Sequence, residues 1–564
     1  MLKSKSIRFL VVFIAALAGI WIALQLGAVL GGTTPPDQHP LSGLIQVLTG
    51  KRKAGIITWV LLGLVGLGVI ILAALYPVDS QDSNSVETKN RLMRAQKLAQ
   101  AASSTDLAKT TDSRGLLLGT IDKGKTPVFQ SWESCSLIFM GARMGKTTGY
   151  VIPNALQSPG PYILTTNKYD GVAEVIAARG NRGRVWIFDP EAVLPKTEQN
   201  SAPWMQWDLW SRVNTKSDAE AVAKILNHST KLTDADTVSS SDSFFEPKSY
   251  ALAVALLFIA SQQRMKIYDL HKLLIDGNLS RLEALLSEGF PLLALDIKGL
   301  ANQPDKTRDN ILAGASRILG PIANDMVLKW IEPDGSADSF SPDAFVRSQD
   351  TLIVLVKDGG TSAASLSSLL VDAVFAAASA AAAPRLDPPL VADLDEINNT
   401  VHIKDLPDRY TYYGSKGLVV NAYLQAYASG EKLWGKTGYK QIRSAATVKV
   451  VGGGLEDKEE LESLSAMIGK YERSTSSYSY NSASGGTSSV ARRTSSHSKQ
   501  WHDIMTVSEL ANLPRYQAVV RIAGFGSGIV EKKPWFEDED FSAAVSTADV
   551  AAVARSLGFE PTHS

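Results

Sequence analysis

The sequence predicts an α/β protein with a parallel sheet, an all-α domain inserted into that sheet, and two transmembrane helices in front of it. Three observations support this fold class. From residue 137 onward, short apolar segments typical of strands alternate with helical segments, as in parallel sheets with crossover helices. Residues 217–330 carry a helical pattern throughout. Two long uncharged apolar runs precede both regions.

The two uncharged runs, residues 9–30 and 54–76, contain 22 and 23 residues. Each is long enough to cross a bilayer of about 30 Å as a helix, and two spans return the chain to its starting side. The first run is longer than the apolar region of a typical signal peptide, and no convincing cleavage site precedes the second run. We therefore expect both runs to stay in the protein as spans.

Basic residues set the expected orientation of these spans. They precede the first run at Lys3, Lys5 and Arg8, follow the second at Lys89, Arg91, Arg94 and Lys97, and occupy the intervening loop at Lys51, Arg52 and Lys53. The excess outside the loop weakly favours a cytoplasmic location for both termini.

Composition limits the function classes. The 564 residues are enough for several domains, and 57 Lys and Arg balance 57 Asp and Glu. This balance predicts no overall attraction to nucleic acid, so any DNA contact must use local patches. The single cysteine, Cys135, excludes an internal disulfide and fits a reducing compartment, where it is better interpreted as a small core residue than as a reactive thiol.

A phosphate-binding loop is predicted at residues 137–148, which read LIFMGARMGKTT. Its backbone N–H groups would face phosphate oxygens, Lys146 would reach the β and γ phosphates, and Thr147 would ligate Mg²⁺. The complete pattern has glycine where this chain has Met140. The predicted nucleotide-binding residues are Gly141, Ala142, Arg143, Met144, Gly145, Lys146, Thr147 and Thr148.

A pair of adjacent acids supports this interpretation. Residues 389–399 read PLVADLDEINN, a short apolar strand that ends in Asp395 and Glu396. A P-loop ATPase needs one carboxylate in the Mg²⁺ shell, here Asp395, and one that activates water, here Glu396. Alone, such a segment is more often a strand before a solvated acidic turn. With the loop it predicts a nucleotide hydrolase that uses ATP and Mg²⁺, and a site using ATP must face the cytosol.

Polar residues also end two other predicted strands. Gln425 follows the strand at 418–424, where an amide could sense the γ phosphate or orient water, so we include it among the catalytic candidates with Lys146 and Glu396. Lys168 follows the strand at 162–165 on the edge where such sheets bind ligands, although a solvated lysine is an equal alternative. The remaining strands are expected at 185–188, 351–356, 447–451 and 516–521.

The expected domain organisation follows from these patterns. The predicted segments are a membrane anchor (1–78), a juxtamembrane linker (79–125), the first part of the nucleotide-binding domain (126–215), the all-α domain (216–335), the second part of the nucleotide-binding domain (336–535) and a C-terminal tail (536–564). Residues 474–498 are dominated by Ser, Thr, Gly, Asn and Tyr, a composition that buries too little apolar surface to offset its ordering entropy. We interpret them as a mobile loop.

The chain resembles the coupling proteins of bacterial type IV secretion, the TraG/TraD-like conjugation ATPases, from the two spans to about residue 535. Besides the two nucleotide motifs and the strand ending at Gln425, the matching segments are GYVIPNAL, PGPYILTTNKYDG, VWIFDPE, FFEPKSYALAVALL, TVKVVGGG and MTVSELANLP. Together these segments are specific to the family.

The resemblance implies a RecA-like P-loop NTPase domain carrying the all-α domain, assembled as a homo-hexamer at the bacterial cell membrane with its ATPase domain in the cytoplasm. Such a motor moves DNA, without sequence specificity and with its attached relaxase, or other secreted proteins, toward a type IV secretion channel. The family often has an arginine about 11 positions before the sensor glutamine, which acts on a neighbour's nucleotide. Here Gly414, Ser415 and Lys416 lie there. Lys416 is a poor substitute for a planar bidentate donor, which leaves Arg409 and Arg443 as alternatives.

Three functions fit the sequence. The first is a membrane-anchored, ATP-driven motor of conjugative DNA transfer. The second is a related motor that secretes protein substrates or moves chromosomal DNA, although the DNA-reading winged helix of segregation motors is not evident. The third is a docking receptor that binds nucleotide with little turnover, an alternative suggested by Met140 and the missing arginine and opposed by Lys146, Asp395 and Glu396.

Overall fold

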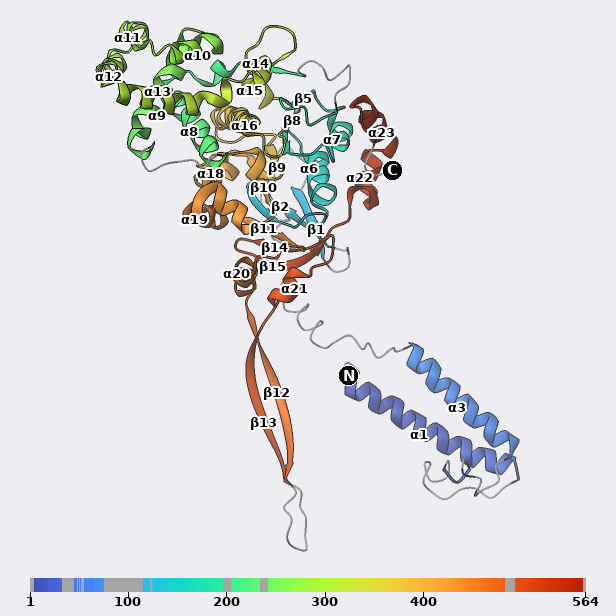
Figure 1. The fold of residues 1–564 in the computed structure, drawn as a ribbon. Coiled ribbons are helices and arrows are strands. Elements are labelled where there is room, and N and C mark those ends of the chain that lie inside the picture. The colour runs from blue at the N-terminus through green and yellow to red at the C-terminus, as the bar shows by residue number, and fades with distance from the viewer. Residues whose placement is uncertain are drawn as a thin grey trace. The chain divides into compact units, whose positions relative to one another are not determined.

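A computed structural model divides the chain into two compact units, residues 1–87 and 88–564, each of which is described by itself (Figure 1). The described residues are 5–32, 45–47, 49, 51, 55–75, 115–121, 124, 126–195, 204–233, 242–481 and 492–560. Most of the predicted juxtamembrane linker lies outside them.

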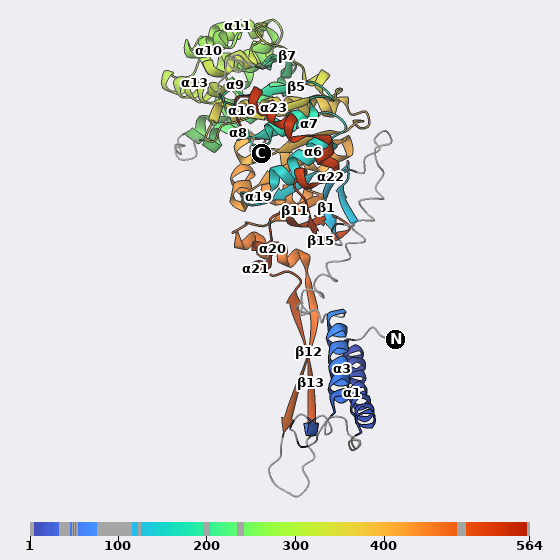
Figure 2. The same ribbon diagram turned by 90° about the vertical axis from the view of Figure 1, so that its right-hand side faces the viewer.

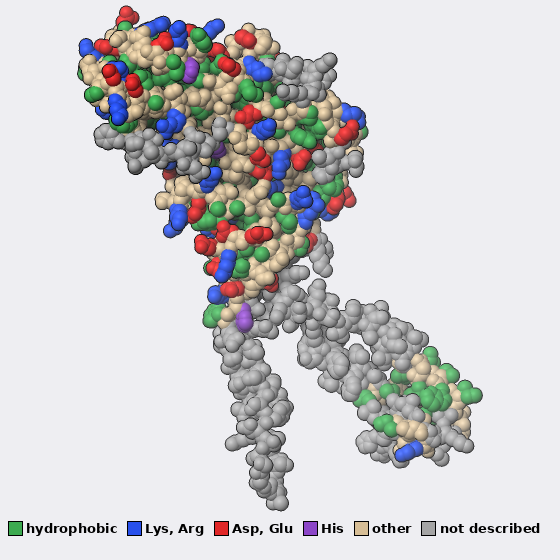
Figure 3. Space-filling view, viewed as in Figure 1, with side chains coloured by type: hydrophobic (Ala, Val, Ile, Leu, Met, Phe, Trp, Pro, Cys, Tyr) green, Lys and Arg blue, Asp and Glu red, His purple; other side chains and the backbone are tan. Residues whose placement is uncertain are grey.

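The first unit contains two antiparallel helices, α1 (Lys5–Leu30) and α3 (Ile56–Leu75) (Figures 1 and 2). They approach closely at Gly27, where a Cβ atom would lie 2.6 Å from Thr58 Cα. The outward-facing side chains are apolar and exposed, and they form the green patches of this unit in Figure 3. These side chains include Trp21, Ile22, Leu26, Val29, Leu30, Ile56, Trp59, Val60 and Leu64.

Within the described residues, one helix is long and apolar enough to cross a membrane, Ser362–Ala381. Because 83% of its apolar stretch is buried inside the second unit, it is a core helix. The described apolar stretches of α1 and α3, Leu17–Leu30 and Ile56–Val65, are shorter. Both predicted spans form helices. Because their described apolar stretches are short, their passage through a membrane stays a prediction.

An 11-stranded sheet organises the second unit. Its spatial order is β2 (Thr126–Gln130), β1 (Leu116–Ile121), β15 (Gly526–Glu531), β14 (Gln517–Ile522), β11 (Val448–Gly452), β3 (Ser136–Phe139), β10 (Leu418–Leu424), β9 (Leu390–Leu394), β4 (Tyr162–Thr166), β8 (Thr351–Leu355) and β5 (Val185–Phe188). Pairing is parallel from β11 to β5 and antiparallel from β2 to β11. The parallel strands β3, β4, β8, β9 and β10 are buried on both faces, as their continuous apolar sequences require.

Helices cover both faces of the sheet (Figures 1 and 2). Side chains of α6 (Ile152–Gln157), α7 (Val172–Arg179), α22 (Glu539–Ala544) and α23 (Thr547–Ser556) share a hydrophobic cluster with Ile138 of β3. Its neighbours Leu137 and Phe139 point to the other face. That face packs against α16 (Thr361–Ala381), α17 (Ile397–Thr400), α18 (Leu406–Tyr413), α19 (Tyr427–Ala445), α20 (Lys458–Ile468) and α21 (Val507–Ala511).

Arg179, at the end of α7, is fully buried and ties the loops at the edge of the sheet together. Its guanidinium donates hydrogen bonds to the carbonyl oxygens of Ala155, Ser158, Gly160 and Gln349, and its Nε donates to Thr351 Oγ1. A buried charge is tolerated here because every side of the planar group has an acceptor.

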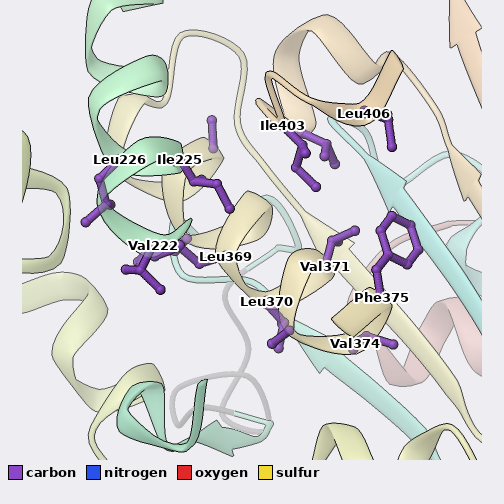
Figure 4. Close-up of a cluster of buried hydrophobic side chains, with 14 of the residues drawn as sticks. Val222, Ile225, Leu226, Leu369, Leu370, Val371, Val374, Phe375, Ile403 and Leu406 are labelled. Atoms are coloured by element: carbon purple, nitrogen blue, oxygen red, sulfur yellow. The ribbon is translucent and has the colours of Figure 1, made fainter. Parts of the chain in front are cut away.

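The region predicted to be all-α contains helices and the turns that join them, and no strand among its described residues. Its helices are α8 (Lys216–Thr233), α9 (Asp242–Gln262), α10 (Ile267–Ile275), α11 (Leu279–Ser287), α12 (Pro291–Ala301), α13 (Asp305–Leu319) and α14 (Asp325–Ile331), and they lie between the short paired strands β6 (Gln206–Trp207) and β7 (Ser339–Phe340). The helices do not form a separate compact unit, because α8 packs on α16 through one continuous hydrophobic cluster (Figure 4). Val222 and Ile225 lie beside Leu369 in this contact.

The described part of the segment 474–498 forms strands and not the predicted loop, while its mobility stays a prediction. Strands β12 (Lys470–Asn481) and β13 (Arg492–Asp503) pair in an unbroken antiparallel register from Lys470↔Asp503 to Asn481↔Arg492. The composition argument concerns a hydrophobic core, which a two-stranded ribbon does not require, since its ladder satisfies the backbone groups of both strands. Thr and Tyr also favour extended backbone.

Two further boundaries differ from the sequence prediction. The predicted linker ends in strand β1, which pairs with β2, so residues from 116 onward belong to the sheet. The predicted tail packs back on the protein, where α23 contacts α7 and the rings of Phe559 and Tyr169 lie 4.9 Å apart. The apolar side chains Phe541, Val550 and Ala554 hold it in the core.

Candidate nucleotide-binding site

The predicted phosphate loop connects β3 to a helix at the centre of the sheet. Two residues in it have left-handed backbone, Arg143 with φ 61° and Gly145 with φ 92°. The helix begins as a π-helical turn, Thr147–Val151, and continues as α6. Of the predicted binding residues, Gly141, Lys146 and Thr148 are buried, Met144, Gly145 and Thr147 are half-buried, and Ala142 and Arg143 are exposed. The sequence thus forms the strand, turn and helix that a phosphate cradle needs.

Met140 occupies a core position, which explains how the loop accommodates it. Its side chain is buried against β11, and a Cβ on Gly452 would lie 2.4 Å from Met140 Cε. Gly141 makes the close backbone approach, since its N–H donates to the carbonyl of Gly453 at 3.1 Å. A Cβ on Gly141 would lie 2.2 Å from the carbonyl oxygen of Gly454. The position that requires glycine in this loop is therefore residue 141 and not residue 140.

Lys146 and Glu396 meet above the carboxyl ends of β3 and β9. Lys146 Nζ lies 3.9 Å from Glu396 Oε1, and both side chains are nearly buried. Among the described residues, Lys146 Nζ has no hydrogen-bond partner. A buried ammonium group without an acceptor is costly, and phosphate oxygens would supply the missing acceptors.

Glu396 is the centre of a polar cluster. Its carboxylate accepts hydrogen bonds from Asn167 Nδ2 at 3.0 Å and from Gln425 Nε2, and Lys168 Nζ lies 3.7 Å away. Its backbone is left-handed, with φ 47°, a conformation that costs a non-glycine residue of order 1–3 kcal/mol. Such strain persists only where surrounding contacts over-determine it, and it aims this carboxylate at Lys146.

Asp395 lies beside this cluster in a different environment. Burial raises the pKa of its carboxyl to about 6, while the nearby charge of Lys146 acts in the opposite direction. Its Oδ1 accepts a hydrogen bond from the backbone N–H of Glu396 at 3.1 Å. Thr147, the other predicted metal ligand, begins the helix after the loop, where its Cγ2 lies against Gly171.

A buried polar network surrounds Asp393 in β9, the strand that leads into the acidic pair. Asp393, two residues earlier in β9, accepts hydrogen bonds from Asn154 and Asn421 and from the hydroxyls of Tyr162 and Tyr423. Burial raises the pKa of the Asp393 carboxyl to about 7, and these donors oppose the shift. The network joins β9 to β4, β10 and α6, and so fixes the strand that carries the acids.

Sequence reasoning missed Asn167, Asp358 and Tyr516, which lie around the loop and the acidic pair. Asn167 bridges Glu396 and Asp358, and Asn399 Nδ2 donates to Asp358 Oδ1 at 3.2 Å. Asn167 and Asp358 follow neighbouring strands β4 and β8, so the rule that ligands bind at carboxyl ends of parallel strands could have found them. The third is Tyr516, which lies against Gly145 and has no recognisable signal in the sequence.

Neither alternative for the trans-acting arginine is free in this chain. Arg409 pairs with Asp372 at 2.6 Å and with Asp405 at 3.2 Å. Arg443 pairs with Glu460 at 3.0 Å. Lys416 Nζ donates to the carbonyl of Ser379 at 3.3 Å.

Models of two protein families match this chain. The family "Type IV secretory system Conjugative DNA transfer" matches residues 85–289, and "TraM recognition site of TraD and TraG" matches residues 389–515. A relative, the type IV secretion system-coupling protein VirD4 of Bartonella quintana (strain Toulouse), is 30% identical over 156 residues. That match covers 26% of this chain and 22% of the relative, so the chain spans about a fifth of the relative's length.

Solved structures of the conjugative coupling protein TrwB share the fold. The unbound monoclinic form of TrwBdeltaN70 has a TM-score of 0.56 at 17% identity, over 78% of this chain and 91% of that chain. The complexes of TrwB with the non-hydrolysable analogues GDPNP and ADPNP each have a TM-score of 0.54 at 16% identity, over 78% of this chain and 92% of theirs.

The sheet and the loop define a RecA-like α/β nucleoside triphosphatase fold, which the TrwB structures share. The two family matches together cover more than half of the chain and come from one kind of protein. This chain belongs to the coupling-protein family of type IV secretion.

Proposed function

We propose that this chain is a membrane-anchored, ATP-driven motor that couples DNA, with an attached relaxase, to a type IV secretion channel during conjugative transfer. One observation carries the proposal. In a chain of the coupling-protein family, the buried Lys146 Nζ finds no acceptor among the residues that the structure describes, and it lies 3.9 Å from the strained, multiply hydrogen-bonded carboxylate of Glu396. Phosphate binding and water activation need this pair of groups.

Each residue of the cluster has a role in this proposal. Lys146 neutralises charge that develops on the transferred phosphate, and Glu396 accepts the proton of the attacking water. Gln425 and Asn167 hold the two oxygens of Glu396, so they set the direction from which the carboxylate approaches the water. Before nucleotide binds, Lys146 and Lys168 lie 3.9 and 3.7 Å from Glu396 Oε1, and their attraction holds the side chain in place.

The donor set fits Mg²⁺. Thr147 and Asp395 would supply a hydroxyl and a carboxylate oxygen, and among the described residues no cluster of three or more His, Cys, Asp or Glu forms a metal cage. Mg²⁺ suits such a sparse site because it is usually bound through one or two protein ligands together with substrate phosphates and waters. When bound, Mg²⁺ supplies charge neutralisation at those phosphates.

The anchor and the assembly are part of the same proposal. Helices α1 and α3 pack through small residues and expose apolar side chains outward, as a pair of spans in lipid would. We propose both termini and the ATPase in the cytoplasm and a homo-hexameric ring as the working form. On the visible face of the second unit, cationic and anionic side chains are interspersed (Figure 3). We propose that DNA is bound through local contacts to its backbone phosphates, which carry no sequence information.

The test is the rate of ATP hydrolysis by the full-length protein in nanodiscs, measured against single- and double-stranded DNA at two salt concentrations. A polyanion that gathers subunits should raise the rate, and the stimulation should weaken steeply with salt because phosphate contacts release counterions. Lys146→Ala should abolish turnover with and without DNA.

If no DNA changes the rate of an active, assembled protein while a candidate secreted protein does, protein secretion replaces DNA transport. The absence of a free arginine at the alternative positions favours slow basal turnover. If turnover stays negligible with every DNA and protein while ATP still binds, the docking receptor is the correct function.

A further inference from the structure

Tyr516 holds an unusual conformation next to the phosphate loop. It immediately precedes β14, and its φ of 65° is left-handed, a region that an aromatic residue seldom occupies. Its ring belongs to neither hydrophobic cluster of the described residues, so core packing does not account for it. Strain of this kind is typically retained at functional sites.

The Tyr516 ring contacts the phosphate loop at residues that follow Gly141. A Cβ on Gly145 would lie 2.4 Å from Tyr516 Cε1, and the Tyr516 hydroxyl lies 3.3 Å from Thr148 Oγ1. The carbonyl of Tyr516 accepts a hydrogen bond from Lys532 N at 2.8 Å, which fixes the residue to β15. The exposed Arg515 places its guanidinium over the ring, with Cζ 4.8 Å from the centroid.

The position of the ring relates to the direction of a bound nucleotide. In a P-loop the backbone cradles the α and β phosphates, and the lysine reaches toward the β and γ phosphates. Lys146 points to Glu396, which places the γ end at the acidic pair. Tyr516 instead contacts Gly145 and Thr148, two residues of the backbone cradle that in a P-loop serves the α and β phosphates. The ribose and base of a nucleotide are attached at the α phosphate.

We infer that Tyr516, with Arg515 stacked on its ring, is the platform that binds the base of the nucleotide. Aromatic rings and guanidinium planes are the groups on which bases stack in proteins. The inference rests on the proposed nucleotide site and assigns the part of it that recognises the base. Loss of one base–aromatic stack should weaken binding by about 5- to 150-fold.

The test compares a ligand with a base and one without. Binding of ADP and of inorganic tripolyphosphate, each with Mg²⁺, is measured by calorimetry on the full-length protein and its variants. Tyr516→Leu should weaken ADP binding about 5- to 150-fold and leave tripolyphosphate within about twofold. Tyr516→Phe, which keeps the ring, should retain ADP affinity. The matched control Tyr268→Leu, on the exposed face of α10, should change neither.

A glycine variant separates binding from folding. Because glycine adopts φ 65° without strain, relief of that strain offsets part of the cost of the lost ring and of the freer unfolded chain, so Tyr516→Gly should stay folded and melt near the wild-type temperature while ADP binding weakens. Equal losses for ADP and tripolyphosphate would show a structural role and overturn the inference. Tighter binding of either ligand by Tyr516→Leu would show that the ring occludes the loop and would overturn the inference. Unchanged ADP affinity in Tyr516→Leu would also overturn the inference. If the wild type binds neither ligand, the proposed nucleotide site fails as well.

Discussion

Replacement of Glu396 by glutamine separates chemistry from binding in this site. The change keeps the shape of the side chain and removes the group that accepts a proton from water. Positioned general bases contribute typically 10²- to 10⁴-fold, so kcat should fall by that factor, or about 3–5 kcal/mol of transition-state stabilisation. Binding should persist, because Lys146 Nζ, 3.9 Å from the present carboxylate, is released to phosphate oxygens. ATP affinity should stay equal or rise.

The assay follows phosphate release and bound nucleotide in the same preparation. Glu396→Gln should copurify with ATP or retain added ATP through gel filtration, whereas the wild type should retain ADP. Glu462→Gln, at an exposed pair with Lys458, is the matched control and should keep both properties. Wild-type turnover in Glu396→Gln, or loss of ATP binding together with turnover, would refute the assignment of Glu396 as the base.

Three further predictions test stability and topology. Burial lowers the pKa of His402 to about 4 from an unfolded value of about 6.5, so the unfolded state binds more protons between these values. Stability should therefore be lost as pH falls from 6.5 to 4, by up to ~3 kcal/mol, and melting curves of His402→Gln should show a flatter pH dependence. Arg179→Met orphans several buried acceptors and should destabilise by ~3–5 kcal/mol in thermal melts, while Arg184→Met, at an exposed pair, should cost under ~1 kcal/mol. A reporter fused at Pro35 should lie outside the membrane and one at Ser103 inside; finding the second outside would refute a cytosolic ATPase.

The central motifs were predictable because they are local. Strand β3, the glycine turn and Lys146 are adjacent in sequence. Strand β9, Asp395 and Glu396 are adjacent in the same way. Gln425 was predictable from the rule for carboxyl ends of strands, and the structure brings its amide to Glu396. Asn167 and Asp358 are 191 residues apart and meet only because β4 and β8 pair, so the sheet order has to be known first.

Other features were missed because composition does not encode them. The serine-rich ribbon lacks a core but satisfies its backbone through strand pairing, which a test of hydrophobicity cannot detect. The hairpin of β1 and β2 is short and follows a polar stretch, so the sequence predicts a linker where β1 lies. The left-handed backbone of Tyr516 has no signature, since the residue is not glycine, asparagine or aspartate.

The support of the phosphate loop explains why its glycine pattern departs from the usual one. The loop rests on the turn after β11, where Gly453 accepts the Gly141 N–H and Met144 packs against Gly454. The N–H of Gly454 in turn donates to the carbonyl of Ala511 at 3.4 Å, in the helix that follows the ribbon. Because backbone contacts on this side require glycine at 141 and at the turn, a methionine at the preceding position only fills core volume. The cradle is therefore built jointly by the loop and by the turn after β11, and its glycine requirement is shared between them.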